Sequence, residues 1–141
     1  MLTKHNRHSL GLQLPSPRRY PLSYSLAVII TLLSLLPIGN VEMAKNVPLA
    51  DKWTHMVMYF SITFVIGYEY ARQHKCASTF IPSFKYILRA LFVPIMMGGL
   101  LELAQAYCTT YRSGDWLDFA ANSIGCAIGT YLSLCYARIR E

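Results

Sequence analysis

Four apolar segments, each close to the length of a membrane helix, constrain this chain more than any other feature of its sequence. The first runs from Tyr20 to Val41, a stretch of 22 residues without a charged side chain. About 20 apolar residues are enough for a helix to cross the hydrocarbon core of a bilayer. We therefore predict an all-α fold, a four-helix transmembrane bundle, with helices over about 20–41, 52–70, 86–107 and 116–137.

The composition supports a single membrane domain. Hydrophobic residues make up 54% of the 141 residues and charged residues only 14%, whereas soluble domains carry about 25% charged residues. Residues 1–19 are basic and contain Pro15 and Pro17, so we predict a cytoplasmic tail there and a transmembrane domain over 20–141. We expect the first helix to be retained, because Glu42 is poorly placed before a signal-peptide cut after Ala44.

The distribution of Lys and Arg predicts the orientation. Three lie in the connections after the first and third helices, namely Lys45, Lys52 and Arg112, and the other ten lie in the tails and the middle connection. Basic residues accumulate on the cytoplasmic side of membrane proteins. Both termini are therefore predicted to be cytoplasmic. The net charge of +6 then reflects topology, and we predict no nucleic-acid partner.

The cysteines give no sign of a disulfide or a metal centre. Cys76, Cys108, Cys126 and Cys135 form no C-x-x-C pair and have no metal-like spacing with the four histidines. We predict no metal site and no cofactor.

This topology brings polar residues from three separate stretches to the outer face of the membrane. Tyr59 joins them because it lies on the same helix face as Asp51 and His55. Capping of helix starts would equally account for Asp51 and Asp118, and headgroup anchoring for Lys52 and Arg112. The candidate ligand-binding residues are Asp51, Lys52, His55, Tyr59, Glu102, Gln105, Arg112, Asp118 and Asn122, with Asp115 in the loop beside them.

Glu102 is the residue in this group that anchoring and capping do not explain. It lies near the C-terminal end of its predicted helix, where the helix dipole disfavours an anion. An ionised carboxylate at membrane depth costs on the order of 3 kcal/mol, so a paired or functional role is expected. Glu102 and His55 are the candidate catalytic residues. Gly125 and Gly129, four residues apart, are predicted to allow close helix packing.

These motifs resemble the VanZ-like family of small bacterial membrane proteins. The matching elements are Asp51-Lys52-x-x-His55-x-x-x-Tyr59, Glu102-x-x-Gln105, and Arg112 followed by Asp118-x-x-x-Asn122-x-x-Gly125-x-x-x-Gly129. They span roughly residues 51–130. The resemblance implies a multi-pass protein of the bacterial inner membrane associated with resistance to teicoplanin.

Three functions are compatible with this sequence. The first is a non-catalytic envelope protein that binds a polar membrane lipid, a lipid-linked wall precursor or a lipoglycopeptide at the outer face and contributes to glycopeptide resistance. The second is a membrane enzyme acting on a lipid-linked substrate, with Glu102 or His55 as acid or base. The third is a small proton-coupled exporter. We favour binding over catalysis, because no nucleophile signature stands out.

Overall fold

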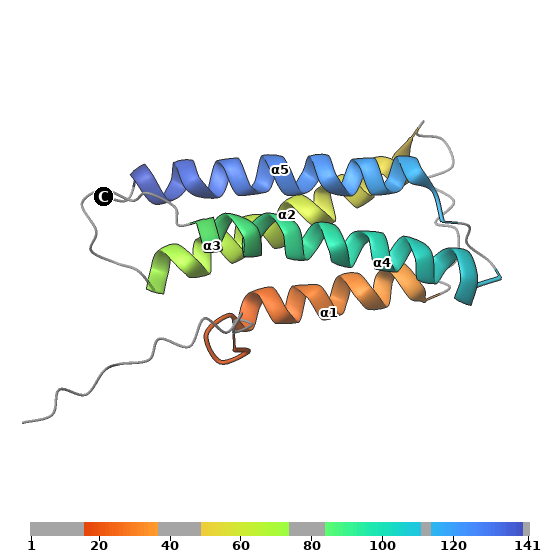
Figure 1. Ribbon diagram of the computed structural model, residues 1–141, viewed down its shortest axis with the longest axis horizontal. Helices are drawn as coiled ribbons and strands as arrows, with labels where there is room; N and C mark the ends of the chain where they lie inside the picture. The colour runs from red at the N-terminus through yellow and green to blue at the C-terminus, as the bar shows by residue number, and fades with distance from the viewer. Residues whose placement is uncertain (1–15, 37–48, 74–83, 111–113, 140–141) are drawn as a thin grey trace, which may run out of the picture.

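The computed structural model describes residues 16–36, 49–73, 84–110 and 114–139, and these are helical with no strands. The all-α prediction is therefore confirmed. Four helical rods lie side by side (Figure 1). They are α1 (Pro21–Leu35), α2 (Ala50–Gln73), a rod made of α3 (Phe84–Ile87), the π-helical turn η2 (Leu88–Phe92) and α4 (Val93–Cys108), and finally α5 (Trp116–Ile139).

Helix α1 is shorter than the predicted span of 20–41. It begins with Pro21 in its first turn, where the missing N–H of proline costs no hydrogen bond. The backbone becomes extended at Leu36. Residues 37–41 lie outside the part of the chain that the structure describes.

The third rod changes its helical geometry just before Pro94. A proline inside a helix removes one backbone donor and its ring clashes with the carbonyl four residues earlier. The π-helical turn Leu88–Phe92 immediately precedes this position, and wider turns of this kind relieve such clashes. Pro94 is therefore accommodated inside the rod, where it is buried against the neighbouring helices.

Helices α2 and α5 form the most extensive helix pair. Three contacts along the pair join Thr63 to Gly129, Gly67 to Ser133, and Tyr68 to Tyr136. Their sequence separation stays nearly constant, so the two helices run parallel. α1 and α4 run in the opposite direction, and the starts of α2 and α5 therefore share one end of the bundle with the ends of α1 and α4 (Figure 1).

Glycines set the close spacing of α2 and α5. A Cβ atom at Gly125 would lie 2.3 Å from the carbonyl oxygen of Met56 and 3.0 Å from the amide nitrogen of Phe60. A Cβ at Gly129 would lie 2.4 Å from the carbonyl oxygen of Phe60. Because these neighbours are backbone atoms, no side-chain rotation can make room for a larger residue. The Gly125-x-x-x-Gly129 motif thus lies directly at the helix contact.

At the other end of the bundle, Glu69 of α2 holds the start of α1. Its carboxylate accepts hydrogen bonds from the backbone N–H of Leu22 at 2.9 Å, the N–H of Ser23 at 3.0 Å and the Ser23 hydroxyl at 2.5 Å. The first N–H groups of a helix have no partner within the helix, and Glu69 supplies one for two of them. Glu69 is only 5% exposed.

We predict that Gly125→Leu destabilises the bundle by about 1–3 kcal/mol, because the added volume meets backbone atoms that cannot move away. Thermal unfolding of the purified protein in detergent would measure the loss. Ala127→Leu adds a large side chain to an exposed position of the same helix and is the matched control. Equal unfolding temperatures for the two variants would contradict the close approach at Gly125.

Candidate functional site

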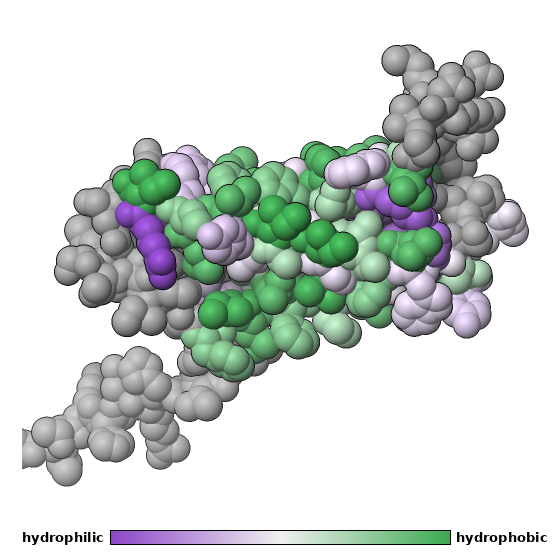
Figure 2. All heavy atoms as spheres, turned by 90° about the horizontal axis from the view of Figure 1, so that it is seen from above, coloured by the Kyte–Doolittle hydropathy of each residue, from purple (hydrophilic) through white to green (hydrophobic). Residues whose placement is uncertain are grey.

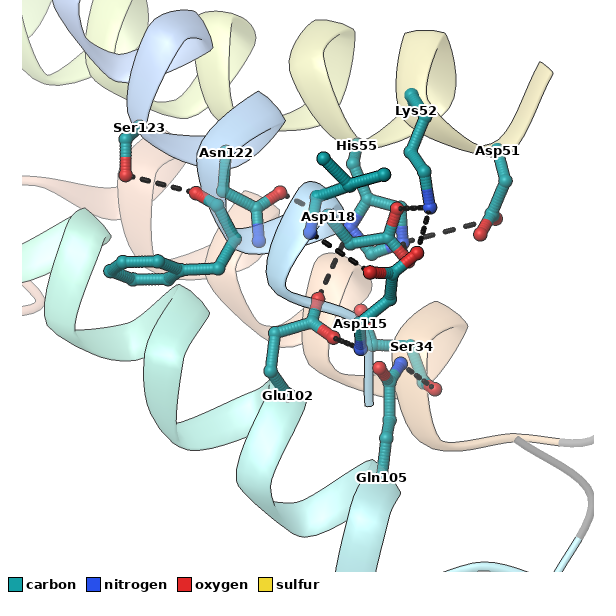
Figure 3. A network of polar contacts seen from close by, with 12 residues as sticks. Ser34, Asp51, Lys52, His55, Glu102, Gln105, Asp115, Asp118, Asn122 and Ser123 are labelled. Carbon is teal, nitrogen blue, oxygen red and sulfur yellow. Dashed lines mark hydrogen bonds and ion pairs between the residues drawn. The ribbon is translucent and has the colours of Figure 1, made fainter. Parts of the chain in front are cut away.

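A group of charged and amide side chains gathers where α2 and α5 begin and α4 ends (Figure 3). We call it the polar end cluster. α2 contributes its first turns, α4 its C-terminal half, and the start of α5 and the residue before it close the group. Its members are Asp51, Lys52, His55, Glu102, Asp115, Asp118 and Asn122.

Lys52 pairs with two carboxylates from the start of α5. Its Nζ atom lies 2.5 Å from Asp115 Oδ2 and 2.5 Å from Asp118 Oδ1. Asp115 also receives a hydrogen bond from the Leu117 N–H on its other carboxylate oxygen, at 2.9 Å, and so caps the start of α5. The hydrogen bond from Lys52 and the backbone bond from Leu117 hold the pKa of Asp115 below its ordinary value. The positive charge of Lys52 is therefore compensated by two carboxylates.

His55 is the centre of the cluster. It is 3% exposed, and its Nδ1 atom lies 3.1 Å from the side-chain oxygen of Asn122. An amide oxygen only accepts hydrogen bonds, so Nδ1 carries the proton. The other ring nitrogen, Nε2, lies 3.9 Å from Asp51 Oδ1 and 3.9 Å from Asp118 Oδ2. Both distances are too long for hydrogen bonds.

Glu102 turns from α4 into the cluster. One carboxylate oxygen accepts a hydrogen bond from the Asp115 N–H at 3.2 Å, and the other lies 3.7 Å from His55 Nδ1. The side chain is 10% exposed. Arg112, another of the candidate ligand-binding residues, lies outside the described residues.

Tyr59 and Asn122 lie one turn deeper, beside Gly98 of α4. A Cβ at Gly98 would be 3.2 Å from the Tyr59 ring and 3.2 Å from Asn122 Nδ2. The Tyr59 hydroxyl and Asn122 Nδ2 are buried and have no hydrogen-bond partner among the residues described. Buried polar atoms without partners are rare in proteins and often mark functional sites.

Gln105 does not join the polar end cluster. Its side-chain amide donates a hydrogen bond of 2.8 Å to the backbone oxygen of Ser34, near the end of α1. The end of a helix leaves carbonyl oxygens without partners, so Gln105 attaches α1 to α4. The sequence grouped Gln105 with the ligand-binding candidates because it shares a helix face with Glu102.

Sequence reasoning missed Glu69 and gave Asp115 no more than a loop position. The signal for Glu69 was present, because it is an acid near the C-terminal end of a helix, as Glu102 is. The polar partner that explains it lies 46 residues away at Ser23, and no sequence pattern joins the two. The contact of Gly98 with Tyr59 and Asn122 was missed for the same reason, because these residues lie far apart in the sequence.

Comparison with known proteins gives one informative similarity. The chain is 28% identical over 116 residues to an uncharacterized protein of the fission yeast Schizosaccharomyces pombe, which covers 82% of this chain. The chain spans 65% of the length of that relative. No protein-family model matches this chain, and no solved structure does. The resemblance to the VanZ-like family stays a prediction.

These findings correct the predicted localisation and function. A protein of a eukaryote is similar to this chain, and within the described residues one helix, Leu88–Cys108, is long and apolar enough to cross a membrane. The prediction of a multi-pass protein of the bacterial inner membrane that contributes to teicoplanin-type resistance is therefore wrong. α1 is apolar but shorter, with 15 residues.

We predict that Lys52→Met destabilises the protein by roughly 1–3 kcal/mol, because it leaves Asp118 buried without its cation. Fully buried pairs lose more when one partner is removed, and Lys52 keeps 21% of its side chain exposed. Chemical denaturation in detergent would measure the difference. Lys52→Arg keeps the charge and should recover most of the stability. Equal stability of the Lys52→Met and Lys52→Arg variants would show that the ion pair contributes nothing to stability.

Proposed function

We propose that the third rod holds the protein in a lipid bilayer, that exposed apolar side chains of the other rods contact lipid, and that the polar end cluster binds the head group of a membrane lipid carrying a cationic amine. The observation that carries the proposal is the charge of the cluster. Four carboxylates, on Asp51, Glu102, Asp115 and Asp118, face one lysine among the described residues. A partner attracted to this end of the bundle brings positive charge.

The distribution of polarity supports the bilayer. Large apolar side chains lie on the outside of every rod, among them Val28 at 57%, Leu100 at 62% and Ile124 at 53% exposed. The interior holds polar side chains as well as apolar ones, including Thr63 at 0% and Ser133 at 1% exposed. Soluble proteins bury most of their large apolar side chains and rarely expose large continuous apolar areas. Figure 2 shows the apolar surface between two polar ends.

The helix Leu88–Cys108 supports the same conclusion. It has 21 residues, enough for the hydrocarbon core of a bilayer. The core helix of a soluble protein also passes such a length test, but that helix is mostly buried. Here 28% of the apolar window is buried, so its surface is available to acyl chains.

The basic side chains support an orientation in which the polar end cluster faces away from the cytoplasm. Arg19, Arg72, Arg89 and Arg138 belong to the opposite end of the bundle, where α1 and the third rod begin and α2 and α5 end. Lys52 lies at the cluster end and is neutralised. The side richer in unpaired basic residues is normally cytoplasmic.

A cationic head group suits this end of the bundle better than an anionic one. In the structure the ammonium of Lys52 is already bound by Asp115 and Asp118. Glu102 and Asp51 lie beside His55, and their carboxylate oxygens are the proposed acceptors for the amine. Charge-assisted hydrogen bonds from an ammonium to carboxylates contribute about 1.5–3 kcal/mol each.

Extraction of membranes with alkaline carbonate tests the first part of the proposal. The full chain should stay in the membrane pellet, because its apolar surface remains in contact with lipid. Release into the supernatant would show that the apolar surface is covered by protein instead.

Lipid binding tests the second part. Native mass spectrometry of the detergent-purified protein, with metal chelator present, should retain phosphatidylethanolamine in preference to phosphatidylglycerol with the same acyl chains. Glu102→Gln should weaken this retention by about tenfold. The matched control is Glu69→Gln, which removes a buried acid at the opposite end of α2. Equal retention of both lipids, or equal loss in both variants, would overturn the amine site.

A further inference from the structure

We propose that Asp51, His55 and Asp118 form a binding site for one divalent transition-metal ion of the Zn²⁺ or Mn²⁺ type. The ligand atoms are Asp51 Oδ1, His55 Nε2 and Asp118 Oδ2, and they lie within 4.8 Å of one another. One imidazole and two carboxylates suit these ions. The site does not depend on lipid binding, and it differs from the prediction of no metal made from the sequence.

The protonation of His55 leaves the correct nitrogen for a metal. Because Nδ1 donates to the Asn122 oxygen, the lone pair of the neutral ring lies on Nε2. That nitrogen faces the two carboxylates and is not engaged in a hydrogen bond with either. Histidine ligands of metals commonly donate their second nitrogen to an oxygen in this way, which fixes the ring orientation. Asn122 has that role here.

Asp118 is arranged in the same manner. Lys52 pairs with Oδ1 at 2.5 Å and leaves Oδ2, the oxygen closer to His55, for an ion. The side chain is 6% exposed and is fixed in place by this pair. Both buried ligands therefore have an outer partner that orients them.

The backbone positions the three ligands. Asp51 and His55 are four residues apart on α2, so they project from the same helix face. Asp118 comes from the first turn of α5, and the glycine contact between the two helices sets its distance from α2. The Asp51 side chain is 54% exposed, which opens the site toward water.

The distances fit an ion with small adjustments. Metal bonds of about 2.0–2.2 Å to nitrogen and oxygen place ligand atoms roughly 3–3.5 Å apart. The two pairs that include Nε2 are 3.9 Å apart. Closing them requires a movement of less than about an ångström, and the exposed Asp51 has room to make it.

Charge supplies the reason for an ion at this place. With His55 neutral, the described cluster of four carboxylates and one lysine has a charge of −3, from −4 and +1. Negative charge on buried carboxylates such as Asp118 and Glu102 is costly unless hydrogen bonds or cations compensate it. A divalent cation reduces the charge to −1 and bonds to the oxygens directly.

A metal-binding experiment in the absence of lipid tests the inference. Chelator-treated, lipid-free full-length protein in detergent should bind one equivalent of Zn²⁺ or Mn²⁺ by calorimetry and metal analysis, and its unfolding temperature should rise. Asp51→Asn and His55→Ala should each weaken binding by more than about a hundredfold, and Asn122→Ala by about ten- to hundredfold. Bound Mn²⁺ should show nitrogen coupling in its electron paramagnetic resonance spectrum, and His55→Ala should abolish that coupling.

Two results would overturn the site. One is the absence of stoichiometric metal binding to the unsubstituted protein. The other is unchanged affinity in Asp51→Asn, a half-exposed position where folding is not at risk. Glu102→Gln separates the two proposals, because it should retain the metal and lose the lipid. Loss of metal in Glu69→Gln would also count against the site.

Discussion

The arrangement of this protein depends on how closely α2 approaches α5. Gly125 and Gly129 leave no space for a side chain between the helices, and the two helices run parallel in register. His55 therefore meets Asn122, and Lys52 meets Asp118. A larger residue at either glycine would separate both pairs together. The glycine packing motif therefore also sets the geometry of the polar end cluster.

The distribution of polarity differs from that of a typical soluble domain. Hydroxyl and amide side chains share the interior with a small apolar core, and many large apolar side chains lie on the outside. Interior polar groups join the rods through specific hydrogen bonds, such as Gln105 to the Ser34 carbonyl and Tyr86 to Ser133. Such bonds are favourable where water is absent, because the alternative is an unsatisfied group. This construction suits a bundle surrounded by lipid.

Excess negative charge links the two proposals for the polar end cluster. Lys52 neutralises part of it and fixes the start of α5. The Nε2 atom of His55 faces Asp51 and Asp118, and these three groups are arranged for a cation. An amine head group and a metal ion satisfy the same requirement by different chemistry. Glu102 distinguishes them, because it contacts the Nδ1 side of the ring and lies outside the metal ligands.

The sequence by itself determined the helical class, the close-packing glycines and most residues of the cluster, because helical periodicity and rare charges in apolar segments are local signals. It also led to a wrong cellular setting, since motif resemblance carries no information about the organism. Only the tertiary structure decided which charges pair. It assigned Lys52 to Asp115 and Asp118, Gln105 to α1, and Glu69 to the start of α1. These partners lie tens of residues apart, and helix register decides whether they meet.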